Sequence, residues 1–174
     1  MSSLGVFDVA NYFLALTKSN EFDVRDGEEG ISNLKLQKLC YYAQGFWLAL
    51  KGECLFNEDI EAWQHGPAIF KLYEKYKEYK SNPIPASSDF DIDSIPKEIA
   101  SFLNEIYQEY GQYSAWKLRA MTHRESPWLN AMERIRENPM PEDTKDLEAV
   151  YKGMESRIVS DQDMAKFFKT KIRS

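Results

Sequence analysis

The chain has 174 residues, with 28 acidic against 22 basic side chains and a formal net charge of −6. This is the length of one ordinary domain. An acidic chain repels a phosphate backbone, so direct nucleic-acid binding is not expected. No run approaches the ~20 apolar residues of a membrane-spanning helix, and the N-terminus lacks the pattern of a secretory signal. We therefore expect a cytoplasmic protein with no membrane partner.

The first two predicted helices differ in how much apolar surface they carry. Val6–Lys18 has apolar residues along one helical stripe, and the acidic segment Glu21–Gly30 after it is predicted to be a loop. Ser32 can cap a second helix, Asn33–Lys51, which Gly52 can end. Because this second helix is apolar on most sides, it is predicted to lie at the centre of the fold.

A short β-hairpin and a third helix are predicted next. Two short apolar runs near residues 54–63 flank Asn57-Glu58-Asp59, a pattern typical of a hairpin. The third helix is expected from Gly66 to Tyr79, since Pro67 is tolerated in a first helical turn. Its inward face is predicted to consist of Ile69, Leu72, Tyr73 and Tyr76.

Three more helices are predicted after a long surface loop. The loop covers residues 81–94, which contain prolines, serines and aspartates. Pro96 lies in the first turn of the fourth helix, Ser114 can cap the fifth, and Ser126-Pro127 opens the sixth.

The C-terminal segment begins at a proline-rich break over residues 138–141. Two further helices are predicted, over 144–156 and from a Ser160 cap to about Ile172. The whole chain is thus predicted to be mainly α, a single compact domain of about seven to eight helices. Residues 1–137 would form the main helical part, and residues 138–174 would form a C-terminal helical extension packed on it.

Neither the cysteines nor the histidines form a recognisable chemical motif. Cys40 and Cys54 make no Cys-x-x-Cys pair, and His65 and His123 lack the spacing of a zinc site. We therefore expect no catalytic residue, no metal and no cofactor. Each histidine is expected to bond a backbone carbonyl and hold a turn, and a catalytic role for either is the alternative.

Two lysines stand in an unfavourable place. Lys35 and Lys38 fall in the early turns of the second predicted helix, where positive charge opposes the helix dipole. A locally unfavourable choice can mark a functional site. Alternatively, the acidic segment Glu21–Glu29 folds over the two lysines and neutralises them, and the sequence leaves both interpretations open.

Three blocks of the sequence form a recognisable pattern. The first block is Ile31–Leu50. The second contains Leu55-Phe56, Glu61-Ala62-Trp63 and Gly66-Pro67, and the third contains Leu118, Thr122-His123, Glu125 and Pro127-Trp128. In this order the blocks resemble the Panacea domain, the SocA-like antitoxin domain also found in GepA-type phage-associated proteins, and the resemblance covers Val6 to Arg136.

This resemblance implies a protein-binding module of a toxin–antitoxin system, one that neutralises a cognate protein toxin, encoded by an adjacent gene, by direct binding. The alternative is a proteolytic adaptor that delivers a client protein to a ClpXP-type protease, and a third hypothesis is an enzyme using His65 or His123. The candidate partner-binding residues are Lys35, Lys38, Tyr41, Tyr42, Trp63, His65, Tyr73, His123 and Trp128. For the two tryptophans, packing in the core is the alternative.

Overall fold

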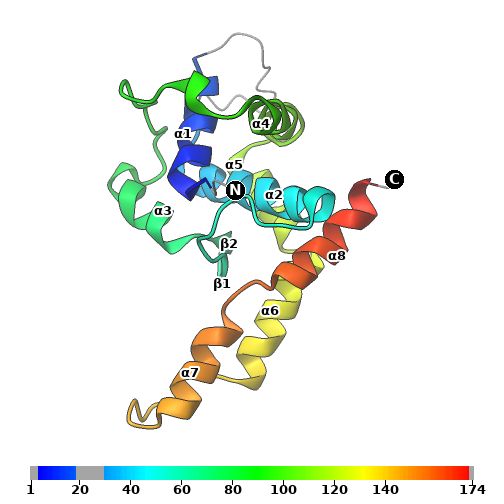
Figure 1. The fold of residues 1–174 in the computed structure, drawn as a ribbon. Coiled ribbons are helices and arrows are strands. Elements are labelled where there is room, and N and C mark those ends of the chain that lie inside the picture. The colour runs from blue at the N-terminus through cyan, green and yellow to red at the C-terminus, as the bar shows by residue number, and fades with distance from the viewer. Residues whose placement is uncertain (1–3, 19–29, 173–174) are drawn as a thin grey trace.

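The computed structural model describes residues 4–18 and 30–172, so the predicted acidic loop before Gly30 lies outside the described residues. The described part is mainly α, as predicted, with eight α-helices and a two-stranded antiparallel hairpin (Figure 1). The α-helices are α1 (Val6–Leu16), α2 (Asn33–Lys51), α3 (Phe70–Tyr76), α4 (Lys97–Tyr110), α5 (Ala115–Thr122), α6 (Ser126–Glu137), α7 (Leu147–Ser156) and α8 (Asp161–Ile172). The strands are β1 (Glu61–Trp63) and β2 (Gly66–Ala68), and two 3-10 helices are η1 (Lys77–Tyr79) and η2 (Ile92–Ser94).

Helix α2 is the centre of the fold, with the bounds that the sequence predicts. The Ser32 hydroxyl accepts a hydrogen bond from the Lys35 amide at 3.3 Å, and Gly52 ends the helix with a left-handed φ of 74°. Helices α1, α3, α4, α5 and α8 and strand β2 all pack against α2. Because neighbours surround the helix, most of its side chains are buried, and Cys40 is among them as a small core residue.

Helix α8 crosses α2 at a glycine. A side-chain carbon on Gly45 would overlap the ring of Phe168, so only glycine allows this approach. Phe168 is fully buried, and its ring meets Tyr41 and Tyr42 edge-on, with centroids 5.5 and 5.9 Å apart. Helix α8 thus fills the core beside the central helix α2.

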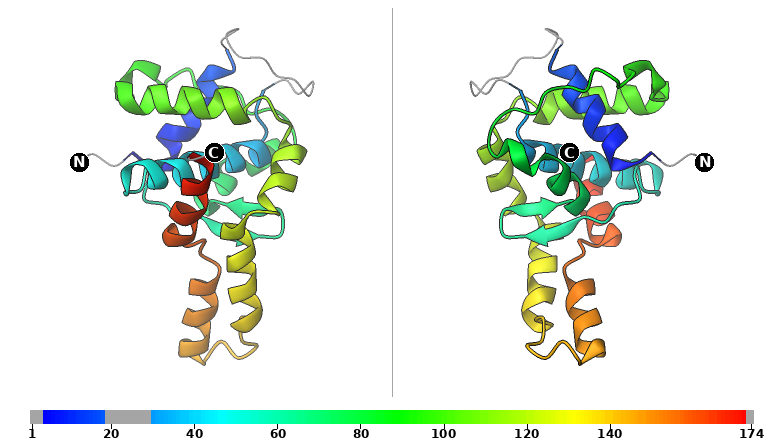
Figure 2. Two further views of the ribbon diagram at one scale, coloured as in Figure 1. Left: turned by 90° about the vertical axis from the view of Figure 1, so that its right-hand side faces the viewer. Right: turned by 90° about the vertical axis from the view of Figure 1, so that its left-hand side faces the viewer.

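Helices α6 and α7 form an arm that projects from the body before the chain returns as α8 (Figures 1 and 2). After α7, the chain runs beside β1: the Val159 amide donates to the Ile60 carbonyl, and the Ala62 amide donates to the Arg157 carbonyl, both at 2.7 Å. The arm is therefore anchored at its base, whereas α8 packs on the body. The division of the chain at residue 138 stays a prediction.

The β-hairpin lies later in the chain than predicted. Strand β1 pairs with β2, with Trp63 opposite Gly66, and residues 54–59 belong to neither strand. The predicted first strand is wrong because the side chain of Gln44, on α2, takes up backbone hydrogen bonds of Leu55 and Phe56 that a partner strand would otherwise make. The Gln44 amide accepts from the Leu55 and Phe56 amides and donates to the Phe56 carbonyl, over 2.7 to 3.3 Å.

Helix α3 starts later than predicted because Gly66–Ala68 form strand β2, in which Gly66 has a positive φ of +109°. The Ile69 amide, at the start of α3, donates to the Gln37 side chain at 2.7 Å. Leu72 and Tyr76 face inward as predicted, but Tyr73 is 41% exposed, so its predicted place in the core is wrong. Within the described residues, every helix is too short or too polar to span a bilayer.

Candidate functional site

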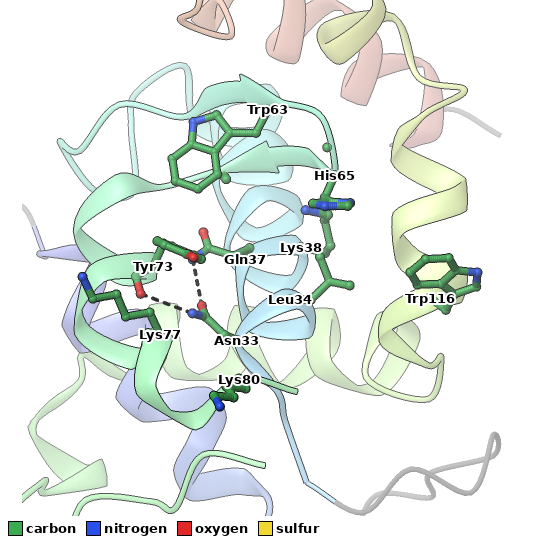
Figure 3. A pocket seen from close by; sticks show the side chains of 12 residues that line it. Asn33, Leu34, Gln37, Lys38, Trp63, His65, Tyr73, Lys77, Lys80 and Trp116 are labelled. Carbon is green, nitrogen blue, oxygen red and sulfur yellow. Dashed lines mark hydrogen bonds between the residues drawn. The ribbon is translucent and has the colours of Figure 1, made fainter. Parts of the chain in front are cut away.

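The polar residues of the first sequence block hold the β-hairpin from the α2 side. The Lys38 ammonium donates to the Pro67 carbonyl at 2.9 Å. One residue earlier, the Gln37 side chain accepts from the backbone amide of Ile69. Asn33 donates to the Tyr73 carbonyl at 3.3 Å and accepts from the Gln37 amide at 3.0 Å, as Figure 3 shows. Helix α2 therefore fixes β2 and the start of α3 together.

The third sequence block holds the same hairpin from the opposite side. The Trp128 indole N–H donates to the Trp63 carbonyl at 2.8 Å, and His123 Nε2 lies 2.8 Å from the Gln64 carbonyl oxygen. His123 Nδ1 lies 2.7 Å from the Arg119 carbonyl oxygen. Both ring nitrogens therefore face backbone carbonyl oxygens. His123 thus bonds a backbone carbonyl and holds a turn, as predicted.

The hairpin, α2 and α5 meet at Gly66. A side-chain carbon there would come within 2.8 Å of the Thr122 hydroxyl and 2.9 Å of Lys38 Cε. The positive φ of Gly66 and this crowding have the same consequence: the position accepts only glycine. The Gly-Pro pair of the second block is therefore a close-approach point between strand β2 and two helices.

The predicted residues Tyr41 and Tyr42 lie in a buried cluster rather than on a surface. Their hydroxyls donate to the two carboxylate oxygens of Glu125, at 3.0 and 2.9 Å. Burial raises the pKa of Glu125 to about 7, although the two tyrosine hydrogen bonds oppose the rise. The Tyr110 ring stacks on Tyr42 with centroids 4.0 Å apart. Glu125 was missed as a candidate because its partners lie more than 80 residues away in the chain.

Lys35 and Lys38, the two lysines in the early turns of α2, are both buried. The Lys35 ammonium donates to the Gly111 carbonyl at 2.8 Å, and Lys38 donates to the Pro67 carbonyl. Burial and, to a smaller extent, the nearby positive charge of Arg119 together lower the pKa of Lys38 to about 7. The acidic segment that was the alternative explanation of the two lysines lies outside the described residues.

A groove opens over the N-terminal half of α2, and we call it the aromatic groove. It has a volume of about 440 Å³. Figure 3 shows α2 beneath it, the hairpin and α3 with η1 on one side, and Trp116 of α5 on the other. Its lining residues are Asn33, Leu34, Gln37, Lys38, Trp63, His65, Gly66, Ala68, Tyr73, Lys77, Lys80 and Trp116.

The groove brings together four of the nine predicted partner-binding residues: Lys38, Trp63, His65 and Tyr73. The others lie elsewhere. Lys35, Tyr41 and Tyr42 are fully buried, and His123 and Trp128 hold the hairpin from behind. His65 is exposed, and its Nδ1 accepts from Arg119 Nε at 3.2 Å, so the expected bond to a backbone carbonyl is wrong for this histidine.

The exposed tryptophan of the groove was not among the predicted site residues. Trp116 is 66% exposed, because Ala115, Leu118 and Thr122 form the buried face of α5. The Arg119 guanidinium lies over the Trp116 ring, 4.7 Å from its centroid. The signal was present in the sequence, since residue 116 lies two positions before Leu118 and so faces away from it on a helix.

The comparisons with known proteins agree with one another. A family model described as "Antitoxin SocA-like, Panacea domain" matches residues 36–129. Antitoxin SocA of Caulobacter vibrioides is 32% identical over 131 residues, which cover 69% of this chain and 66% of the length of that relative. No solved structure matches the chain. The matched segment contains the β-hairpin and the residues that bond its backbone from outside, namely Lys38, His123 and Trp128. Helices α7 and α8 lie beyond the match.

Proposed function

The chain belongs to the family of antitoxin SocA-like Panacea domains, and from this premise we propose that it neutralises a cognate protein toxin by binding it directly. The observation that carries the proposal is the aromatic groove, in which Trp63, Tyr73 and Trp116 line one hollow. Large aromatic side chains with polar tips supply most of the binding energy in many interfaces. We further propose that the toxin is encoded by an adjacent gene and that binding takes place in the cytoplasm.

Binding explains the motif residues better than catalysis does. His123 is held between two carbonyl oxygens and lies beside Trp128, with ring centroids 4.2 Å apart. His65 accepts from Arg119, and Glu125 receives two tyrosine hydroxyls. Each of these groups therefore has a structural contact within the fold. We therefore propose no enzymatic role.

Co-expression in a bacterial host tests the proposal. The product of the neighbouring open reading frame, induced alone, is expected to arrest growth, and co-expression of this chain is expected to restore it. The double variant Tyr73→Ser with Trp116→Ser is expected to lose the rescue, because it removes the two most exposed aromatic rings of the groove. Its melting temperature is expected to stay within a few degrees of wild type, since neither ring is buried.

Tyr151→Ser provides the matched control. Tyr151 lies on α7, outside the groove, and is 63% exposed, close to the value for Trp116. This variant is expected to rescue growth like wild type. A harmless neighbouring gene product, or a toxin that this chain does not bind, would contradict the proposed function. If the groove variant still rescues growth and Tyr151→Ser does not, the toxin binds the arm and not the groove.

A second candidate function, a proteolytic adaptor, is favoured by a second apolar surface. Leu147, Tyr151 and Met154 follow one stripe of α7, and each is exposed over more than half of its surface. They lie on the projecting arm, away from the body (Figure 1). An adaptor needs one surface for its client and another for the protease, and the groove and this stripe are separate.

The adaptor function predicts a shorter half-life of the bound protein. Addition of this chain to a ClpXP-type protease is expected to accelerate degradation of the partner. The triple variant Leu147→Ser, Tyr151→Ser and Met154→Ser is expected to lose this effect while still binding the partner. An unchanged partner half-life with the wild-type chain would exclude the adaptor function and leave neutralisation by binding in place.

A further inference from the structure

We propose that the aromatic groove binds a polypeptide segment that combines a carboxylate with an aromatic or aliphatic side chain. The inference rests on the proposed function and adds the chemistry of the segment that the toxin presents. Three independent features carry it: the sign of the charges around the groove, a buried amine in its floor, and its elongated shape.

The charges that line the groove are all of one sign. Among the residues that the structure describes, its ionisable lining residues are Lys38, His65, Lys77, Lys80 and Tyr73, and none of these carries a carboxylate. Glu74 pairs with Lys77 at 3.2 Å, and Glu61 accepts from the Trp63 indole at 3.2 Å. Lys38 and Lys80 are the lining lysines that make no ion pair with another described residue. In a chain of net charge −6, a groove lined by basic groups is a local exception. Such a surface complements a negative segment.

The floor of the groove holds an amine that has no carboxylate partner within the described ranges 4–18 and 30–172. Lys38 is 1% exposed, and among the described residues the Pro67 carbonyl is the only acceptor within hydrogen-bonding distance of its Nζ. An ammonium carries three N–H donors, and buried charges in proteins are normally paired. A carboxylate entering the groove would supply the counter-charge that the described part of the protein does not place there.

The shape of the groove fits a polypeptide. Beyond Leu34 and Trp116 lies a second hollow of about 390 Å³, which shares these two lining residues and continues past Ser32 and Pro83. The two hollows together extend along the start of α2, which suits several consecutive side chains of an extended segment. Trp63 and Tyr73, with ring centroids 5.3 Å apart, offer edge and face to an apolar side chain.

Selection from random nine-residue peptides displayed on phage tests the inference on the full chain. Peptides with Asp or Glu beside an aromatic or aliphatic residue are expected to be enriched at least ten-fold over the unselected library. The most enriched peptide is then synthesised with a twin in which each carboxylate is replaced by its amide. The twin is expected to bind at least ten-fold more weakly in a calorimetric titration.

Variants of the groove decide where the carboxylate binds. Lys38→Met is expected to bind the peptide and its amide twin equally. If that variant does not fold, the surface variant Lys77→Ser with Lys80→Ser is expected to weaken binding of the acidic peptide at least three-fold. Lys152→Ser on α7 is the control and is expected to bind like wild type, since Lys152 is exposed and outside the groove.

Enrichment of basic peptides, no enrichment at all, or equal binding of peptide and twin would each overturn the inference. The selection involves no toxin, so its outcome is independent of the growth-rescue experiment. Rescue without selection of acidic peptides would leave the antitoxin proposal standing and remove this one. Selection of acidic peptides without rescue would remove the antitoxin proposal and leave the groove as a site for acidic segments.

Discussion

Glu125 is a single residue whose carboxyl group connects two elements of the core, α2 and α6. Its carboxylate receives the hydroxyls of Tyr41 and Tyr42 from α2, and it directly precedes α6. Its pKa is raised from an ordinary 4.5 to about 7 by burial. The folded state therefore holds this proton more tightly than the unfolded chain does. The contribution to stability is full below pH 4.5 and is lost as the pH rises through about 7.

We predict that wild type loses roughly 3 kcal/mol of unfolding free energy from this group between pH 4.5 and pH 8. Glu125→Gln keeps an oxygen acceptor and the same size, so it is expected to remove most of that slope. Urea unfolding at several pH values measures it. Glu105→Gln, at an exposed position of α4, is the control and is expected to keep the wild-type slope. An equal slope in the Glu125 variant would show that its carboxyl is not the titrating group.

At the scale of an element, the contact between α2 and α8 depends on Gly45. Gly45→Ala improves helix propensity by up to about 1 kcal/mol, but its methyl group would enter the Phe168 ring. Overpacking of this kind typically destabilises by about 1–3 kcal/mol. We predict a net loss of stability and a loosened α8, measured by chemical denaturation.

A double-mutant cycle tests whether the loss of stability in Gly45→Ala comes from contact between the new methyl group and the Phe168 ring. Phe168→Leu makes room beside residue 45, so combining it with Gly45→Ala is expected to cost less than the sum of the two single changes. Additive effects would mean that the methyl group and the ring do not meet, and that α8 is held by other contacts.

The elements also show what sequence reasoning could reach. The bounds of α2 were predictable because the Ser32 cap and the Gly52 terminator act on neighbouring residues. The hairpin was misplaced because Gln44 binds the backbone of Leu55 and Phe56, a contact that local pattern does not reveal. Only part of the groove was predictable from the sequence. Packing between helices that are distant in the chain decides which aromatic residues stay exposed, and a local pattern does not show this packing.

Lys35 and Lys38, in the early turns of α2, show the same limit. Their positive charge lies near the N-terminus of the helix, where it opposes the helix dipole, and this was visible in the sequence. Their partners, the carbonyls of Pro67 and Gly111, lie 29 and 76 residues away. A sequence pattern can therefore flag such a residue, but only the fold separates Lys38, which lines the groove, from Lys35, which does not.

At the scale of the whole molecule, stability is expected to be uneven. Helix α2 is surrounded by six elements, whereas α7 packs mainly on α6 and turns Leu147, Tyr151 and Met154 outward. Elements with few buried contacts open locally, while central elements exchange their amide hydrogens only when the whole domain unfolds. The arm should therefore open more easily than the body that carries the groove.

Hydrogen exchange followed by mass spectrometry tests this prediction and the division of the chain together. Amides of α2 and α8 are expected to share the highest protection, because Phe168 inserts beside Gly45 and ties α8 to the body. Amides of α7 are expected to exchange at least roughly ten-fold faster than those of α2. In that case residues 138–174 do not behave as one extension, since their first helix moves with the arm and their second with the core. Equal protection of α7 and α2 would instead mean that the arm and the body unfold as one unit, and that a partner bound on the arm meets a surface as rigid as the groove.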